Sequence, residues 1–314
     1  MEVGGMNLNK ATSLLIFLFS ILNFFCQAQT TAKELVRDGI MKARLGDYQA
    51  AIKSFDEAVR MDSTGIEAYY NRGIAKSELK DYKGAIRDFS TVIQLKPSYP
   101  EPYFNRGLAK DYLKDYSGAI DDYNKAINQK ADYVEAYLNR GLAKFDLEDY
   151  REAANDFTRA LQYRPDYPAA FYNRGLARFN LNDYQSAIAD FNEAIRYDTV
   201  SAEYFSSRGA AKAAAGYYED AILDFNVTIQ LLPFDINPYM NRGLAHLYLK
   251  DYPAAIEDYT NVLEIDPAFA DAYLKRGVAR QYNEDLRGAC EDWKKADEIG
   301  SEKARVYLDK YCSP

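Results

Sequence analysis

Apolar and aromatic residues recur at spacings of three and four along most of the chain, and this period predicts amphipathic helices. Two interruptions return in every 34 residues. One lies near Asp-Tyr pairs such as Asp81-Tyr82, and the other lies near prolines such as Pro97 and Pro165. Because both are typical helix boundaries, each unit is expected to hold two antiparallel helices of about a dozen residues.

One glycine marks the register of the units, and no insertion breaks its spacing. It recurs every 34 residues as Gly39, Gly73, Gly107, Gly141, Gly175, Gly209, Gly243 and Gly277. With this glycine as position eight, eight repeats span residues 32–303: 32–65, 66–99, 100–133, 134–167, 168–201, 202–235, 236–269 and 270–303. The remaining segment, 304–314, is expected to form a capping helix and tail.

Small and bulky residues alternate at fixed places in the repeat. Position twenty is alanine in every repeat, and position twenty-four is always aromatic: Phe55, Phe89, Tyr123, Phe157, Phe191, Phe225, Tyr259 and Trp293. Glycine at position eight and alanine at position twenty let the two helices approach closely. One hairpin cannot bury both of its apolar faces, so the repeats are expected to stack into an all-α solenoid.

This pattern resembles the tetratricopeptide repeat (TPR) family. In the fifth repeat the matching residues are Phe171, Gly175, Leu181, Tyr184, Ala187 and Phe191. The resemblance implies a right-handed superhelix of helix-turn-helix repeats. It also implies a concave face, lined by the first helix of each repeat, that binds segments of other proteins.

A charge of each sign recurs inside the apolar pattern. Position seven is Arg72, Arg106, Arg140, Arg174, Arg208, Arg242 and Arg276 in repeats two to eight. Position twenty-three is Asp88, Asp122, Asp156, Asp190, Asp224, Asp258 and Asp292 in the same repeats. The two positions lie symmetrically about the turn, so we interpret them as structural ion pairs within each hairpin. Repeat one lacks both partners, with Asp38 and Ser54 instead. The alternative is an arginine ladder that recognises an acidic ligand.

By the same resemblance, positions two, five, nine, twelve and thirteen line the partner groove. Candidate groove residues are Tyr70, Phe104, Tyr112, Phe145, Tyr172, Phe179, Ser206, Ala210, Ala213, Leu247, Tyr248 and Tyr282. Acids at position two would edge them: Glu67, Glu101, Glu135, Glu203 and Asp271. The small residues of repeat six, between Phe179 on one side and Leu247 and Tyr248 on the other, predict a notch for an apolar anchor of the partner. The alternative is that repeat six is merely alanine-rich.

Asparagine is frequent at position six, as in Asn71, Asn105, Asn139, Asn173 and Asn241. The resemblance suggests comparison with the family's clamp for a C-terminal carboxylate, which also needs lysine at position five and asparagine at position nine. Position five here is aromatic or aliphatic in these repeats, so the clamp is incomplete. The asparagine row either bonds a ligand backbone or links neighbouring helices.

Charge and composition exclude several classes of function. The net charge is −8, without basic clusters, so nucleic acid and anionic lipid are poor candidates for partners. The single histidine, His246, lies mid-helix and cannot build a histidine-rich metal site. Phosphate loops and catalytic constellations are lacking in the sequence. The sequence therefore predicts a protein that is not an enzyme and needs no cofactor or metal.

The first 28 residues differ from the rest. Lys10 precedes an apolar stretch over 13–25, and Cys26 and Ala28 follow it, which is typical of a secretory signal peptide. The expected mature chain begins at Gln29, is periplasmic or secreted, and has no integral membrane span. The alternative is a lipoprotein anchored at Cys26. In an oxidising compartment Cys290 and Cys312 could form a disulfide or remain two separate thiols.

These observations predict an exported scaffold that binds a protein or peptide segment in a concave groove. The alternative is a structural spacer in an envelope or secretion complex that uses its convex face. The sequence names neither the partner nor the oligomeric state.

Overall fold

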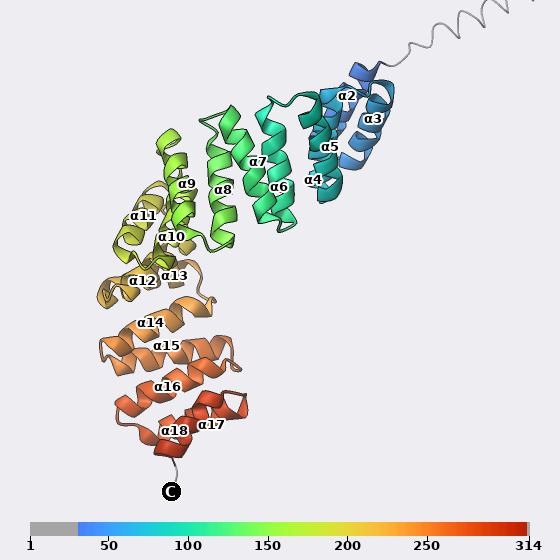
Figure 1. Ribbon diagram of the computed structural model, residues 1–314. Helices are drawn as coiled ribbons and strands as arrows, with labels where there is room; N and C mark the ends of the chain where they lie inside the picture. Colours follow the sequence, from blue (N-terminus) through green and yellow to red (C-terminus); the bar gives the residue numbers. More distant parts are fainter. Residues whose placement is uncertain (1–30, 313–314) are drawn as a thin grey trace, which may run out of the picture. The chain divides into compact units, whose positions relative to one another are not determined.

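The computed structural model describes residues 31–312, which form helices joined by short turns, with no strand among them (Figure 1). The predicted signal peptide, residues 1–28, lies outside this range. The first helices of the repeats are α2 (Ala32–Arg44), α4 (Ile66–Glu78), α6 (Pro100–Tyr112), α8 (Val134–Asp146), α10 (Pro168–Asn180), α12 (Ala202–Ala214), α14 (Ile236–Tyr248) and α16 (Ala270–Tyr282). The second helices are α3 (Tyr48–Met61), α5 (Tyr82–Leu95), α7 (Tyr116–Gln129), α9 (Tyr150–Tyr163), α11 (Tyr184–Tyr197), α13 (Tyr218–Leu231), α15 (Tyr252–Ile265) and α17 (Leu286–Glu298), and α18 (Glu302–Tyr311) follows.

The chain divides into two compact units, Met1–Gly118 and Ala119–Pro314. Within the first unit, α2 to α6 pack against one another in chain order. Within the second, α8 to α18 do the same, each helix against the next (Figure 1). The prediction of an all-α fold built from stacked helix pairs is confirmed.

The turn inside each repeat explains the Asp-Tyr pairs. The second residue after the end of the first helix has a positive φ, near 60° at Lys80 and Glu148 and 86° at Gly216. This left-handed residue ends the helix. In every repeat but the sixth, which has Tyr217 there, the aspartate that follows caps the second helix. Asp81 does so by accepting a hydrogen bond from the Gly84 backbone N–H at 2.9 Å.

Glycine at position eight lies directly against the aromatic ring at position twenty-four. A Cβ atom built on Gly175 would lie 2.7 Å from the Phe191 ring, and one on Gly73 would lie 2.7 Å from the Phe89 ring. These distances are too short for any side chain larger than hydrogen. Both rings are fully buried, so the close approach of the two helices sets the position of the core of each repeat.

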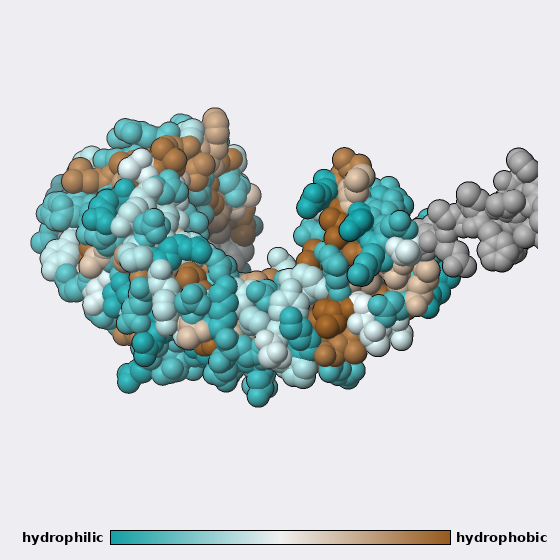
Figure 2. All heavy atoms as spheres, turned by 90° about the horizontal axis from the view of Figure 1, so that it is seen from above, coloured by the Kyte–Doolittle hydropathy of each residue, from teal (hydrophilic) through white to brown (hydrophobic). Residues whose placement is uncertain are grey.

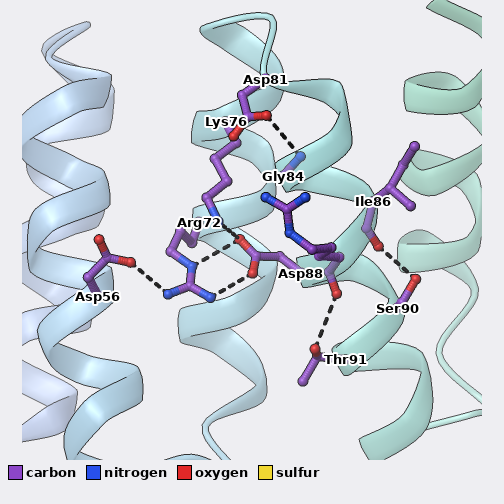
Figure 3. Close-up of polar contacts among 10 residues, drawn as sticks. Asp56, Arg72, Lys76, Asp81, Gly84, Ile86, Asp88, Ser90 and Thr91 are labelled. Carbon is purple, nitrogen blue, oxygen red and sulfur yellow. Dashed lines mark hydrogen bonds and ion pairs between the residues drawn. The ribbon is translucent and has the colours of Figure 1, made fainter. Parts of the chain in front are cut away.

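The arginine at position seven lies between three helices, as the second repeat shows (Figure 3). Arg72 of α4 donates through Nη2 to Asp88 Oδ1 of α5 at 2.6 Å and through Nε to Oδ2 at 2.9 Å. Its Nη1 donates to Asp56 of α3, in the preceding repeat, at 2.6 Å. Lys76 adds a second cation to Asp88 at 2.7 Å. The aspartate is 3% exposed, so its charge is almost entirely out of water.

Six of the arginines pair with the aspartate of their own repeat: Arg72 with Asp88, Arg140 with Asp156, Arg174 with Asp190, Arg208 with Asp224, Arg242 with Asp258, and Arg276 with Asp292. Arg106 and Asp122 belong to different units, and their pairing stays a prediction. Four other repeats add a second cation from position eleven, as Lys144, Arg178, Lys212 and Arg280.

The sequence pattern did not reveal that each arginine also bonds the preceding repeat. In all seven cases Nη1 donates to a polar side chain at position twenty-five of that repeat: Asp56, Ser90, Asn124, Thr158, Asn192, Asn226 and Thr260. The arginine is therefore a tie between repeats as well as an internal ion pair.

This tie accounts for the two end repeats. Repeat one follows no other repeat, and at its position seven Asp38 accepts hydrogen bonds from Lys42 and Ser54 instead. Position twenty-five of repeat eight is Lys294, and the helix after it, α18, has Leu308 as its seventh residue. The one arginine of α18, Arg305, donates to Asp297 instead, so Lys294 meets no arginine of this kind.

The capping helix α18 begins at Glu302, two residues before the expected 304, because α17 and the turn after it are each one residue shorter than in the other repeats. It buries Ala304 and places Tyr307 and Tyr311 against Trp293, with ring centroids 4.9 and 5.8 Å away. At its end, Cys312 forms a disulfide with Cys290 of α17, which covalently fastens the cap to the last repeat.

Breaking one arginine tie should cost more than removing both charges. We expect Arg174→Leu to lower the free energy of unfolding by about 3 kcal/mol, because Asp190 stays buried with Arg178 as its remaining cation. Adding Asp190→Leu should restore part of this loss. A double-mutant cycle from urea denaturation measures the coupling, and simple additivity of the two changes would contradict the pairing.

Candidate functional site

The expected groove residues fall into groups with different surroundings. Tyr112, Tyr248 and Tyr282 are the most exposed, at 67, 61 and 60%. Tyr70 and Tyr172 are half-buried: Tyr70 accepts a hydrogen bond from Asn105, and Tyr172 donates to Glu203 at 2.8 Å. Burial raises the pKa of Tyr70 to about 12 and also raises the pKa of Tyr172. These two tyrosines therefore help to join repeats, and the exposed three are better placed to meet a partner.

The tyrosine at position seventeen stacks in one of two ways. In three places it stacks on position thirteen of the next repeat: Tyr82 on Tyr112 at 4.8 Å, Tyr218 on Tyr248 at 4.7 Å, and Tyr252 on Tyr282 at 5.4 Å. In repeats four and five it contacts the phenylalanine at position twelve of its own repeat, as Phe145 with Tyr150 and Phe179 with Tyr184. The residue at position twelve thus decides what fills the space in front of this tyrosine.

A cavity of about 350 Å³ lies between α12 and α14, where repeat six has its small residues. We call it the repeat-six notch. Its lining is Ala210, Ala213, Ala214, Tyr218, Phe225, Asn241, Leu244, Ala245 and Tyr248. None of these side chains is charged. The cavity therefore suits an uncharged, mainly apolar group.

The walls of the notch differ from those expected. Phe179 and Leu247 do not line it, and neither does Ser206. The back is formed instead by Tyr218 and Phe225 of α13. Sequence reasoning missed these two because it considered only the first helices, although the period of 34 places both next to the alanines of repeat six.

The asparagine row mostly bonds to its own helices. Asn71, Asn139 and Asn173 each donate from Nδ2 to the backbone carbonyl four residues earlier. Asn105 does the same and also donates to Tyr70 of the preceding repeat at 3.0 Å. Among the described residues, Asn241 makes no such bond, and it lines the notch. Its amide is available to a ligand.

A second cavity, of about 360 Å³, opens next to the notch between α14 and α16. It shares Leu244 and Tyr248 with the notch, and Leu247 and Tyr282, both expected in the groove, line it. Lys250 is the one charged residue of this lining. Two adjoining cavities thus lie on either side of Tyr248. The face shown in Figure 2 has separate hydrophobic patches within a largely hydrophilic surface.

A metal site needs several ligating side chains together, and a membrane span needs a long apolar helix. Among residues 31–312, no group of three or more histidine, cysteine, aspartate or glutamate side chains could hold a metal ion. Within the same range, none of the helices combines the length and apolarity needed to cross a bilayer.

His246 takes the place of the lysine or arginine at position eleven. Its Nε2 lies 3.9 Å from Asp258 Oδ2, and its Nδ1 lies 3.5 Å from Asp251 Oδ2. In other repeats the second cation bonds the buried aspartate at 2.7–2.9 Å. Burial raises the pKa of Asp258, and Arg242 and His246 oppose that rise. Among the residues at position eleven that face the buried aspartate in this way, His246 thus makes the longest contact with it.

Family models described as tetratricopeptide repeat match residues 41–64, 66–99, 138–202 and 236–269, and one described as TPR repeat matches residues 112–147. Together these matches cover more than half of the sequence. The chain belongs to the tetratricopeptide repeat family. A TPR protein of this all-helical kind is typically a non-catalytic scaffold for protein–protein interaction. Among curated proteins, none matches the sequence significantly.

Solved structures of TPR proteins show the same fold. The C-terminal part of a TPR repeat-containing protein from Cytophaga hutchinsonii is 18% identical, with 76% of this chain and 97% of that chain covered and a TM-score of 0.66. YrrB, described as a TPR protein with an unusual peptide-binding site, is 21% identical over 60% of this chain and 97% of its own, with a TM-score of 0.54. The MamA protein is 24% identical over 55% of this chain and 94% of its own, with a TM-score of 0.52.

We expect His246→Lys to stabilise repeat seven, because lysine gives Asp258 the second permanent cation that the other repeats have. The gain in the free energy of unfolding should be about 1 kcal/mol. Urea denaturation of the variant and the wild type measures the difference. His246→Gln is the control without a lysine cation, and an equal gain for glutamine would contradict this account.

Proposed function

We propose that this TPR protein binds a segment of a partner protein along its first helices, with an apolar side chain of the partner in the repeat-six notch. The notch carries the proposal. It combines an uncharged lining with one amide, Asn241, whose donors and acceptor are unused within the described residues. Buried anchors that fill such cavities dominate the energy of many protein interfaces.

Each part of the notch has a role in this proposal. The methyl groups of Ala210 and Ala213 leave the space that a bulky side chain would occupy. The stacked pair of Tyr218 and Tyr248 forms a flat wall against which the anchor packs. Asn241 can both donate to a backbone carbonyl and accept from a backbone N–H, so it would hold the main chain beside the anchor.

Filling the notch tests the proposal. The partner is first identified by crosslinking in intact cells, and capture of that same protein is then compared between variants. We expect Ala210→Trp together with Ala213→Leu to abolish capture, because the added side chains occupy the cavity. The helical circular dichroism should stay unchanged. Full capture by this folded variant would remove the notch as the binding site.

A second candidate function is supported by apolar residues away from the notch. Leu223 on α13 is 60% exposed, and Phe234, in the turn before α14, is 83% exposed. Side chains of this size on the surface mark contact sites in some proteins. They favour a spacer role in which the second helices meet neighbouring subunits. Leu223→Trp therefore serves as the matched control for the notch variant: loss of capture there, with the filled notch still active, supports the spacer.

We also propose that the protein is exported and cleaved after Ala28. The apolar segment 13–25 motivates this, and the disulfide between Cys290 and Cys312 supports it, because such bonds persist in oxidising compartments. Mass spectrometry of protein from cells should find an N-terminus at Gln29 and one non-reduced peptide pair joined through the two cysteines. A lipidated Cys26 would instead indicate membrane anchoring, and two alkylatable thiols would contradict the disulfide.

A further inference from the structure

The N-terminal unit contains a cavity of about 320 Å³ between α4 and α6. We call it the α4–α6 cavity. Six of its lining positions carry the same residue as the matching positions of the repeat-six notch; they include Tyr82 and Tyr218, Asn105 and Asn241, and Tyr112 and Tyr248. The two cavities are thus built from the same repeat positions, four repeats apart in the sequence, and the cavity between α14 and α16 uses several of these positions again.

Position twelve explains why this site recurs where it does. It is Ser77 in the α4–α6 cavity and Ala213 in the notch, and both are small. In repeats four and five the position holds Phe145 and Phe179, whose rings lie against the tyrosine at position seventeen. There the phenylalanine takes the place of the open space. The site thus needs the tyrosine pair and a residue other than phenylalanine at position twelve. The cavity between α14 and α16 meets the same condition, with Leu247 at position twelve beside the pair of Tyr252 and Tyr282.

The rim distinguishes the two cavities. Glu78 and Lys80 line the α4–α6 cavity, both exposed, and neither side chain makes an ion pair or hydrogen bond within the described residues. The matching positions of repeat six are Ala214 and Gly216, which are uncharged. The α4–α6 cavity therefore offers an apolar interior beside one carboxylate and one ammonium group.

We propose that the α4–α6 cavity is a second binding site for a peptide segment, and that this segment carries an apolar anchor flanked by a basic and an acidic residue. The anchor enters between Tyr82, Phe89 and Leu108, and the flanking charges pair with Glu78 and Lys80. Asn105 uses its Nδ2 on Glu101 and Tyr70, so its Oδ1 remains to accept a backbone N–H. The inference rests on the function proposed for the notch and extends it to two segments per chain.

NMR signals of alanine methyl groups can report binding at each cavity separately. Ala109 lines the α4–α6 cavity, Ala245 lines the notch, and Ala177 holds the same repeat position at the junction that Phe145 fills. The mature chain labelled at alanine methyl groups is titrated with acetyl-Gly-Leu-Gly-amide, acetyl-Lys-Leu-Glu-amide and acetyl-Glu-Leu-Lys-amide. Acetyl-Gly-Asp-Gly-amide is the control probe without an apolar anchor.

We expect the leucine probes to shift the signals of Ala109 and Ala245 and to leave Ala177 unmoved. At Ala109, the better of the two charged probes should bind about threefold tighter than the uncharged one, with the difference lost at high salt. At Ala245 the three leucine probes should bind alike. Ser77→Phe should abolish only the Ala109 response, and Ala213→Phe only the Ala245 response, because phenylalanine fills this space in repeats four and five.

The outcomes separate the two proposals. A response at Ala245 with none at Ala109 overturns the second site and leaves the notch in place. Failure of every leucine probe at both methyl groups overturns both. Equal binding of charged and uncharged probes at Ala109 overturns the role of Glu78 and Lys80. The other alanine methyl signals, unchanged in both variants, confirm that each variant is folded.

Discussion

In six of the repeats, an ion pair between a buried aspartate and an arginine joins the two helices, and the same arginine bonds the preceding repeat. The aspartate on the second helix is almost completely withdrawn from water, as Asp190 is at 2% exposed. The arginine fork satisfies both of its oxygens and still has Nη1 left for the preceding repeat. The guanidinium group is planar and has donors on several sides, so one arginine can bond side chains of two other helices at once. The compact ammonium group of lysine lacks this fork of donors.

The close approach of the two helices makes this contact possible. Glycine at position eight leaves room for the aromatic ring at position twenty-four, and the neighbouring arginine and aspartate are brought within bonding distance. Close packing and charge pairing therefore support each other. A larger residue in place of Gly175 would push the Phe191 ring outward and separate Arg174 from Asp190 as well.

This arrangement leaves the candidate binding face free to vary. The ion pairs and the core occupy positions seven, eight, twenty, twenty-three and twenty-four, which scarcely change along the chain. Positions twelve and thirteen take no part in the ion pairs or the buried core, and they vary between repeats. Position twelve is phenylalanine, alanine or serine in several repeats, and position thirteen is tyrosine in some repeats and charged in others. Cavities can therefore form at some junctions and be filled at others without a change in the fold, which is a suitable basis for a scaffold with selective sites.

The sequence by itself determined the period, the two helices of each repeat, the small residues at the helix contact and the pairing of Arg174 with Asp190, because these follow from spacing within one hairpin. It also predicted a notch at Ala210 and Ala213, which line the cavity found there, although Ser206 does not. Only the tertiary structure decided what Nη1 of each arginine meets, that Tyr218 and Phe225 form the back of the notch, and that an equivalent cavity surrounds Ser77. Each of these depends on how one repeat stacks on the next. Stacking brings together residues whose separation along the chain gives no sign of contact. Tyr82, for example, stacks on Tyr112 of the next repeat.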